Sequence, residues 1–128
     1  MSETWIVEKD FTFEASHSLP DHDGKCARVH GHSYKVTVRV KAEQLAEKGP
    51  RKGFAGGVDY YDIAKAWEPL HEKLDHRDLN RVDHLGYPTV ERLARFIFDE
   101  LSDALPLIDE VTVCETPSAR CTYRRPHA

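Results

Sequence analysis

The chain has 128 residues and a formal net charge of −4, with 18 Lys and Arg against 22 Asp and Glu. It lacks the basic excess typical of nucleic-acid-binding proteins, and its apolar residues, 40% of the chain, never form a run long enough to span a bilayer. We therefore expect a soluble, cytoplasmic protein, a single domain over residues 1–128, with no nucleic-acid or membrane partner. Its three cysteines have no CxxC spacing, which argues against a disulfide framework.

Alternating apolar residues predict two strands in the first third of the chain. One runs over residues 5–17, and the second, over residues 30–42, alternates more regularly and has one polar face. The residues between them, 18–29, include Pro20 and Cys26 and have the composition of a loop.

Two helices and two further strands are predicted in the remainder. Apolar residues at helical spacing over 63–74 predict an amphipathic helix with a kink at Pro69. A second helix is predicted over 89–105. Short alternating strands follow at 110–116 and 119–124.

The element order strand, strand, helix, helix, strand, strand predicts an α+β fold in which both helices pack on one face of an antiparallel sheet. A small sheet has free edges, which natural proteins protect, often by association with other subunits. We therefore expect a homo-oligomer.

Three histidines fall on one predicted face. His30 and His32 are two residues apart in a strand and point to the same side, and His17 continues the apolar parity of the first strand. One interpretation is that they are ordinary core histidines. Burying three unpartnered imidazoles would cost about 1–3 kcal/mol each, so a shared zinc ion explains them better. The remaining histidines are expected on the surface or in loops: His22, His71, His84 and His127.

Cys26 lies four residues before His30, and its spacing leaves two roles open. It can be a fourth ligand, which makes a closed structural site in a non-catalytic protein. It can also be a nucleophile or base beside an open metal.

Two carboxylates have similar alternatives. Asp75 and His76 follow the first predicted helix, where they can form an oriented proton relay or simply cap the helix end. Glu115, at the end of the third long strand, can receive paired donors from a ligand or can be solvated on a sheet edge.

Five segments, taken together and in this order, resemble the 6-pyruvoyl-tetrahydropterin synthase family over nearly the whole chain. They read FTFEASH, CARVHGHSY, LDHRDLN, PTVERLA and CETP. The short gap between Cys26 and His30 is most similar to the bacterial branch, the 6-carboxy-5,6,7,8-tetrahydropterin synthases of queuosine biosynthesis. The resemblance implies the tunnelling fold, in which ββααββ subunits join through their sheets into a barrel, as a trimer or hexamer.

The resemblance also implies the metal site and the proton chemistry. It makes His17, His30 and His32 the ligands of one Zn2+ per subunit and Cys26 the catalytic proton acceptor. It implies a pterin triphosphate substrate, 7,8-dihydroneopterin triphosphate, converted to 6-carboxy-5,6,7,8-tetrahydropterin with release of triphosphate and acetaldehyde. The alternative within the family is the pyruvoyl-forming elimination on the same substrate.

Other roles are carried over by position. Asp75 and His76 match the relay that works with the cysteine, and Glu115 matches the carboxylate that anchors the pterin ring. Thr89 and Thr116 lie in flanking motifs as weaker candidates for substrate contact.

The chain departs from the family pattern at two places. Gly56 and Gly57 stand where a short apolar strand is usual, and two glycines weaken any strand there. Tyr87 stands where an asparagine commonly precedes Pro-Thr. A contact made there by an amide is therefore not expected.

Overall fold

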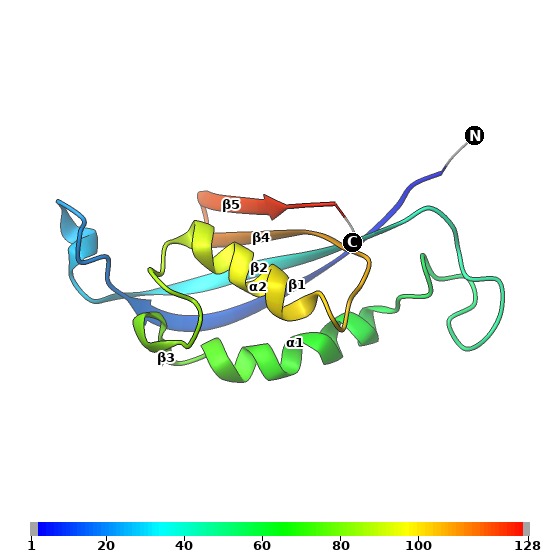
Figure 1. The fold of residues 1–128 in the computed structure, drawn as a ribbon, viewed down its shortest axis with the longest axis horizontal. Helices are drawn as coiled ribbons and strands as arrows, with labels where there is room; N and C mark the ends of the chain where they lie inside the picture. Colours follow the sequence, from blue (N-terminus) through cyan, green and yellow to red (C-terminus); the bar gives the residue numbers. More distant parts are fainter. Residues whose placement is uncertain (1–2, 127–128) are drawn as a thin grey trace.

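A computed structural model describes residues 3–126 and places two helices against one face of a five-stranded sheet (Figure 1). The strands are β1 (Trp5–His17), β2 (His30–Ala42), β3 (Arg77–Asp78), β4 (Ile108–Thr116) and β5 (Ala119–Arg124). The helices are α1 (Tyr60–Leu74) and α2 (Val90–Leu101), with short 3-10 helices η1 (Lys25–Ala27) and η2 (Leu79–Arg81). The predicted α+β architecture is confirmed.

The strand order is β3-β1-β2-β4-β5. β1 and β2 pair along their whole length, from Trp5 opposite Ala42 to His17 opposite His30. The sheet is antiparallel except at one edge, where the two-residue β3 runs parallel to β1. The predicted antiparallel sheet is confirmed, and β3 is an addition at its edge that was not predicted, because a strand of two residues has no alternating pattern to read.

The core lies between the sheet and the helices. Every second side chain of β1 and β2 points into it, and the Phe13 and Tyr34 rings, neighbours across the two strands, stack with centroids 4.9 Å apart. α1 packs against β1, while α2 packs against β4 and β5. Burying one side chain of this size stabilises the fold by about 1.5–3 kcal/mol, so this face fixes the register of both long strands.

The bounds of both helices differ in detail from the prediction. α1 begins at Tyr60, three residues before the predicted start, and continues through Pro69 to Leu74. α2 ends at Leu101, four residues before the predicted end, although Leu105 is still buried and its N–H donates to the Leu101 carbonyl. Within residues 3–126 no helix is long and apolar enough to cross a bilayer.

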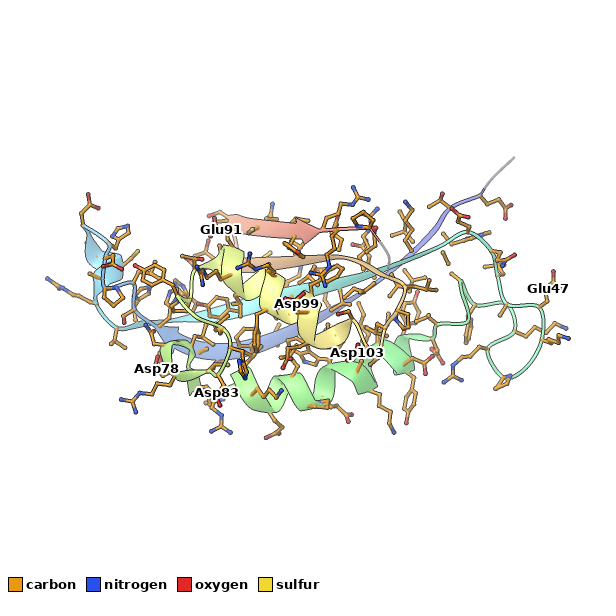
Figure 2. All side chains as sticks on the ribbon, in the orientation of Figure 1. Glu47, Asp78, Asp83, Glu91, Asp99 and Asp103 are labelled. Atoms are coloured by element: carbon orange, nitrogen blue, oxygen red, sulfur yellow. The ribbon has the colours of Figure 1, made fainter. Side chains whose placement is uncertain are left out.

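The connection between β2 and α1 contains the two glycines that depart from the family pattern. Gly56 and Gly57 both have positive φ, at 58° and 72°, and this segment contributes only an isolated bridge between Leu45 and Ala55. The absence of a regular strand over residues 43–59 agrees with the expectation that the two glycines weaken any strand there. This loop lies at one end of the molecule and β3 at the other, as the positions of Glu47 and Asp78 show (Figure 2).

An ion pair fixes the start of α1. Asp59 and Asp62 form a capping box, in which the Asp62 carboxylate accepts from the Asp59 N–H at 2.9 Å. Arg51 donates two bonds to the same carboxylate, from Nε at 2.8 Å and from Nη2 at 2.6 Å. The Arg51 side-chain hydrogen bonds, and then the Asp59 backbone bond, lower the pKa of Asp62 to about 2.

We predict that Asp62→Asn destabilises the protein near neutral pH and has little effect in strong acid. The Asp62 pKa is lower in the folded chain than its ordinary value of about 3.9, so its carboxylate stabilises the fold above that value. The contribution is lost as the pH falls through about 2. Thermal unfolding between pH 7 and pH 2 should therefore show a difference in Tm from the wild type that closes over this range. Asp103→Asn, at an exposed carboxylate after α2, is the control. A difference that stays constant down to pH 2 would contradict the assignment.

Candidate metal centre

Three histidines meet where β1 ends and β2 begins. His17 is directly opposite His30 in the register, and His32 follows two residues later on the same face. One nitrogen from each ring lies within 4.8 Å of the others. His17 is only 1% exposed and lies in the core, whereas His30 and His32 are half-buried and face the surface side of the cluster.

Backbone carbonyls orient two of these rings. Nδ1 of His17 lies 2.8 Å from the Pro88 carbonyl, and Nδ1 of His30 lies 2.7 Å from the Arg28 carbonyl. A carbonyl oxygen only accepts, so each Nδ1 carries the proton and donates it. In the neutral rings both Nε2 atoms then present lone pairs, and these atoms face each other at 3.0 Å.

The third imidazole is poorly satisfied. Nε2 of His32 is buried without a hydrogen-bond partner, and the nearest carboxylate oxygen, Glu115 Oε1, is 3.7 Å away. Burial holds the pKa of His32 below its ordinary value, although the Glu115 carboxylate acts in the opposite direction. His32 therefore stays neutral to lower pH than a free histidine, the state in which imidazole binds a metal.

This set of donors fits a metal ion. Tetrahedral zinc with bonds of about 2.0–2.1 Å to nitrogen spaces its ligand atoms about 3.3 Å apart, close to the 3.0 Å between His17 and His30. Hydrogen bonds from the opposite ring nitrogens to carbonyls are the usual way in which proteins orient metal-binding histidines. His17, His30 and His32 can therefore hold a metal ion.

Cys26 lies outside this cluster. It is half-buried in η1, within the loop that joins β1 to β2, and its carbonyl accepts from the Leu19 N–H at 2.8 Å. In the described residues 3–126, the potential metal ligands that cluster are His17, His30 and His32. Cys26 is not part of this cluster. The loop is anchored further by Tyr87, whose hydroxyl accepts from the Asp21 N–H at 3.2 Å. Tyr87 therefore ties this loop to the segment that precedes α2.

Asp75 and His76 are docked on the strand that carries His17. The Glu14 N–H donates to Asp75 Oδ1 at 2.9 Å, and the Glu14 carbonyl accepts from the His76 N–H. His76 has a φ of 58°, unusual for a non-glycine residue, and its Nδ1 lies 2.8 Å from Asp75 Oδ2. The Glu14 backbone bond, and then the bond from His76, lower the pKa of Asp75.

This pair is both a helix terminus and an oriented acid–imidazole couple. Asp75 is the C-cap of α1, as the simpler interpretation expected, yet its carboxylate is turned to β1 and His76. The Asp75 carboxylate keeps Nδ1 of His76 engaged, so the far nitrogen of this exposed ring is left to exchange protons.

His71 is a neighbour of this pair that was not predicted. Its Nε2 lies 3.9 Å from Asp75 Oδ2, so this carboxylate lies between two imidazoles. The i,i+4 spacing on α1 is the signal that could have identified it. His22 and His84 are exposed, as expected, and His127 lies outside the described residues.

Two cavities adjoin the cluster through His32. One of about 910 Å³ lies over the uncovered face of the sheet and is also lined by Glu115 and Thr116. The other, of about 460 Å³, is lined by His32 and His76 and connects the cluster with the Asp75 pair. Thr89 is placed differently, since its hydroxyl caps α2 by accepting from the Arg92 N–H at 3.3 Å.

Comparison with known proteins places this arrangement in a family. The family model for 6-pyruvoyl tetrahydropterin synthase matches residues 6–126. The chain is 39% identical to a 6-carboxy-5,6,7,8-tetrahydropterin synthase of Synechocystis sp., over 95% of each chain. It is 33% identical to a 6-pyruvoyl tetrahydrobiopterin synthase of Dictyostelium discoideum, over 97% of this chain and 98% of the relative.

The solved structures agree with the sequence relatives. The 6-pyruvoyl tetrahydropterin synthase of Caenorhabditis elegans superposes with a TM-score of 0.81, at 25% identity and with 97% of each chain covered. The fold is accordingly the α+β tunnelling fold. The three-histidine cluster at the end of β1 and β2, the strand order and the match over residues 6–126 lead to one conclusion: the chain belongs to the 6-pyruvoyl tetrahydropterin synthase family.

Proposed function

We propose that this protein is a zinc-dependent lyase of queuosine (7-deazapurine) biosynthesis. It converts 7,8-dihydroneopterin triphosphate to 6-carboxy-5,6,7,8-tetrahydropterin, with release of triphosphate and acetaldehyde. The observation that carries the proposal is the cluster of His17, His30 and His32, which opens through His32 into a cavity shared with Glu115. The similarity to 6-carboxy-5,6,7,8-tetrahydropterin synthases along 95% of the chain supports this choice of product.

The histidines would hold one Zn2+ per subunit. When bound, zinc acts as a Lewis acid that polarises side-chain oxygens of the substrate and acidifies the adjacent C–H bonds. The Pro88 and Arg28 carbonyls orient the His17 and His30 rings through Nδ1, so that both Nε2 atoms would be available to the ion. Three protein ligands leave a position for substrate, as in catalytic rather than structural zinc sites.

Cys26 and the Asp75–His76 pair would move the protons. Cys26 lies outside the ligand cluster, so its sulfur is left free to accept a proton. Asp75 fixes the orientation of the His76 ring through Nδ1, which leaves Nε2 of this ring available to give and take a proton. The cavity lined by both His32 and His76 supports the role of His76.

Glu115 would anchor the pterin. A carboxylate accepts two parallel hydrogen bonds from the guanidine-like edge of the ring, a pairing favoured by geometry and charge. Thr116 lines the same cavity and is a second contact. Thr89 is the weakest candidate, because its hydroxyl already caps α2.

The complete enzyme would be a homo-oligomer, a trimer or hexamer of single-domain subunits. Within the described part of one subunit, β3 covers β1 only at Ala15 and Ser16, so most of the outer edge of β1 is unpaired. β5 forms the opposite edge of the sheet. Pairing of these two edges between copies would close a barrel and satisfy both rows of backbone groups.

The nearest alternative function is formation of 6-pyruvoyl-tetrahydropterin from the same substrate. It is an alternative because one relative, 33% identical to this chain, is the 6-pyruvoyl tetrahydrobiopterin synthase of Dictyostelium discoideum. We predict that incubation with 7,8-dihydroneopterin triphosphate yields the carboxy product and stoichiometric acetaldehyde, measured by mass spectrometry of the pterin and an aldehyde assay. A pyruvoyl product without acetaldehyde would overturn the proposed reaction.

A second alternative is a non-catalytic protein in which Cys26 and the three histidines hold a structural zinc. We predict that Cys26→Ala keeps one zinc per subunit and lowers kcat at least about 100-fold, the usual size of a general acid–base contribution. Metal content and turnover measured on the same preparation test this. Cys121→Ala, at a half-buried strand cysteine, should change neither. Loss of zinc together with activity in Cys26→Ala would favour the structural role.

A further inference from the structure

Three rows of side chains cross the face of the sheet that the helices leave uncovered. In each row one residue of β2, one of β4 and one of β5 are direct neighbours in the register. Directly opposed residues point to the same face and interact with one another. The rows are Arg39, Glu110 and Arg124; Thr37, Thr112 and Thr122; and Lys35, Cys114 and Arg120.

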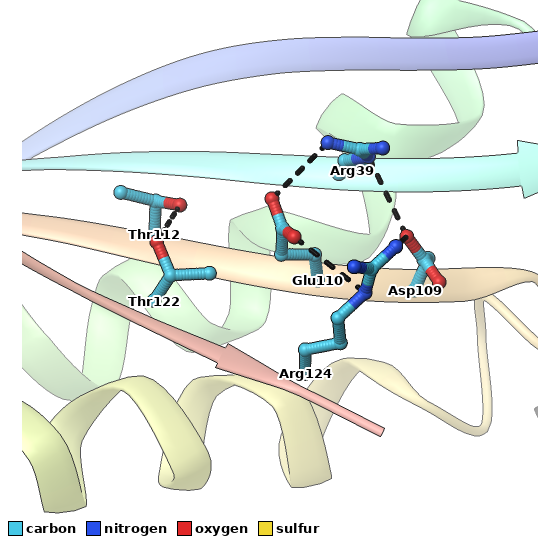
Figure 3. A network of polar contacts seen from close by, with 6 residues as sticks. All are labelled: Arg39, Asp109, Glu110, Thr112, Thr122 and Arg124. Carbon is cyan, nitrogen blue, oxygen red and sulfur yellow. Dashed lines mark hydrogen bonds and ion pairs between the residues drawn. The ribbon is translucent and has the colours of Figure 1, made fainter. Parts of the chain in front are cut away.

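The first row is a complete ionic network (Figure 3). Glu110 lies between two cations, with Arg39 Nη1 3.4 Å from Oε2 and Arg124 Nε 3.7 Å from Oε1. The buried carboxylate of Asp109 pairs with both arginines as well, at 3.4 and 3.3 Å. Each cation of this row therefore faces an anion of the same subunit.

The second row is neutral. The hydroxyls of Thr112 and Thr122 are hydrogen-bonded at 2.7 Å, and Thr37 donates to Asp10 Oδ1 at 2.6 Å. It separates the first row from the third, which lies nearer the histidine cluster.

The third row repeats the first without its anion. Lys35 and Arg120 stand on either side of Cys114, which occupies the place that Glu110 has in the first row. Lys35 Nζ forms an exposed ion pair with Asp10 Oδ2 of β1 at 3.6 Å but no hydrogen bond to it, and Arg120 Nη2 makes one long bond of 3.4 Å to the Pro117 carbonyl. Most donors of both cations thus remain available.

The spacing of the two cations suits an extended anion. They lie two strands apart, which separates their backbones by about 10 Å. Lys35 and Arg120 line the 910 Å³ cavity that also contains His32 and Glu115. The cavity has one further carboxylate, Glu8, but the register places it opposite Arg39 in the first row.

We infer that Lys35 and Arg120 form a binding subsite for linked phosphate groups, and that Cys114 lies between them in the sheet without adding a carboxylate. The guanidinium supplies a planar fork of donors and the ammonium a compact point charge, and both suit phosphate oxygens. The assignment to the phosphate chain of a pterin substrate rests on the proposed function. The pterin end would then lie at Glu115 and the phosphate end over β4 and β5.

Binding of inorganic tripolyphosphate to the intact protein tests the subsite independently of turnover. By titration calorimetry at low ionic strength, the wild-type protein should bind it, and Lys35→Gln and Arg120→Gln should each weaken binding at least about tenfold, as expected for a lost charge-assisted contact. Cys114→Glu should abolish binding, because it supplies the anion that the row lacks, whereas Cys114→Ser should retain it. Lys41→Gln, on the same face of β2 beyond the first row, is the matched control and should bind as the wild type does.

The results separate this inference from the proposed reaction. Equal tripolyphosphate affinity in the wild type, Lys35→Gln, Arg120→Gln and Cys114→Glu would overturn the subsite, as would no binding to the wild type. Binding lost as predicted, in a protein that makes no pterin product, would support the subsite and contradict the proposed function. With substrate, Lys35→Gln and Arg120→Gln should raise KM at least about tenfold and change kcat much less, as for interactions made equally in ground and transition states.

Discussion

The opposition of His17 and His30 is the constraint on which the site depends. Two carbonyls take the Nδ1 protons, so two Nε2 lone pairs face each other at 3.0 Å beside the unpartnered Nε2 of His32. Leaving such nitrogens buried and unsatisfied costs about 1–3 kcal/mol each, and a shared cation removes that cost. The arrangement is therefore preorganised for a metal ion, which the three histidines could hold.

Secondary structure delivers each group to this point. The antiparallel register places His17 opposite His30, and the short parallel strand β3 holds the end of α1 against β1, which brings Asp75 and His76 near the cluster. The 910 Å³ cavity over the uncovered face of the sheet reaches the same point, where it is lined by His32 and Glu115. One end of the sheet thus combines three histidines that could hold a metal ion, the hydrogen-bonded Asp75–His76 pair and a polar surface with cationic side chains.

Much of this is predictable from the amino-acid sequence because it follows from period and burial. Alternation of apolar residues predicts the bounds of both long strands and places three histidines on one face. Apolar alternation does not predict the parallel pairing of β3 or the position of His71 beside Asp75. Both features depend on how α1 ends against β1. The carbonyl groups that accept from His17 and His30 could not be predicted either, because every residue has a backbone carbonyl and its residue type does not show which side chain it contacts. The early end of α2 could not be predicted either, because the apolar pattern continues to Leu105, which is buried beyond the end of the helix.

The central claim is that three imidazoles, and not Cys26, bind the metal. The absorption spectrum of the cobalt-substituted protein tests it most directly, because cobalt reports both the geometry and the donor atoms of a zinc site. The account predicts visible bands of a four-coordinate, nitrogen-rich site and no strong sulfur-to-metal charge-transfer band in the near ultraviolet. A strong charge-transfer band that disappears in Cys26→Ala would show the thiolate bound and would contradict the account.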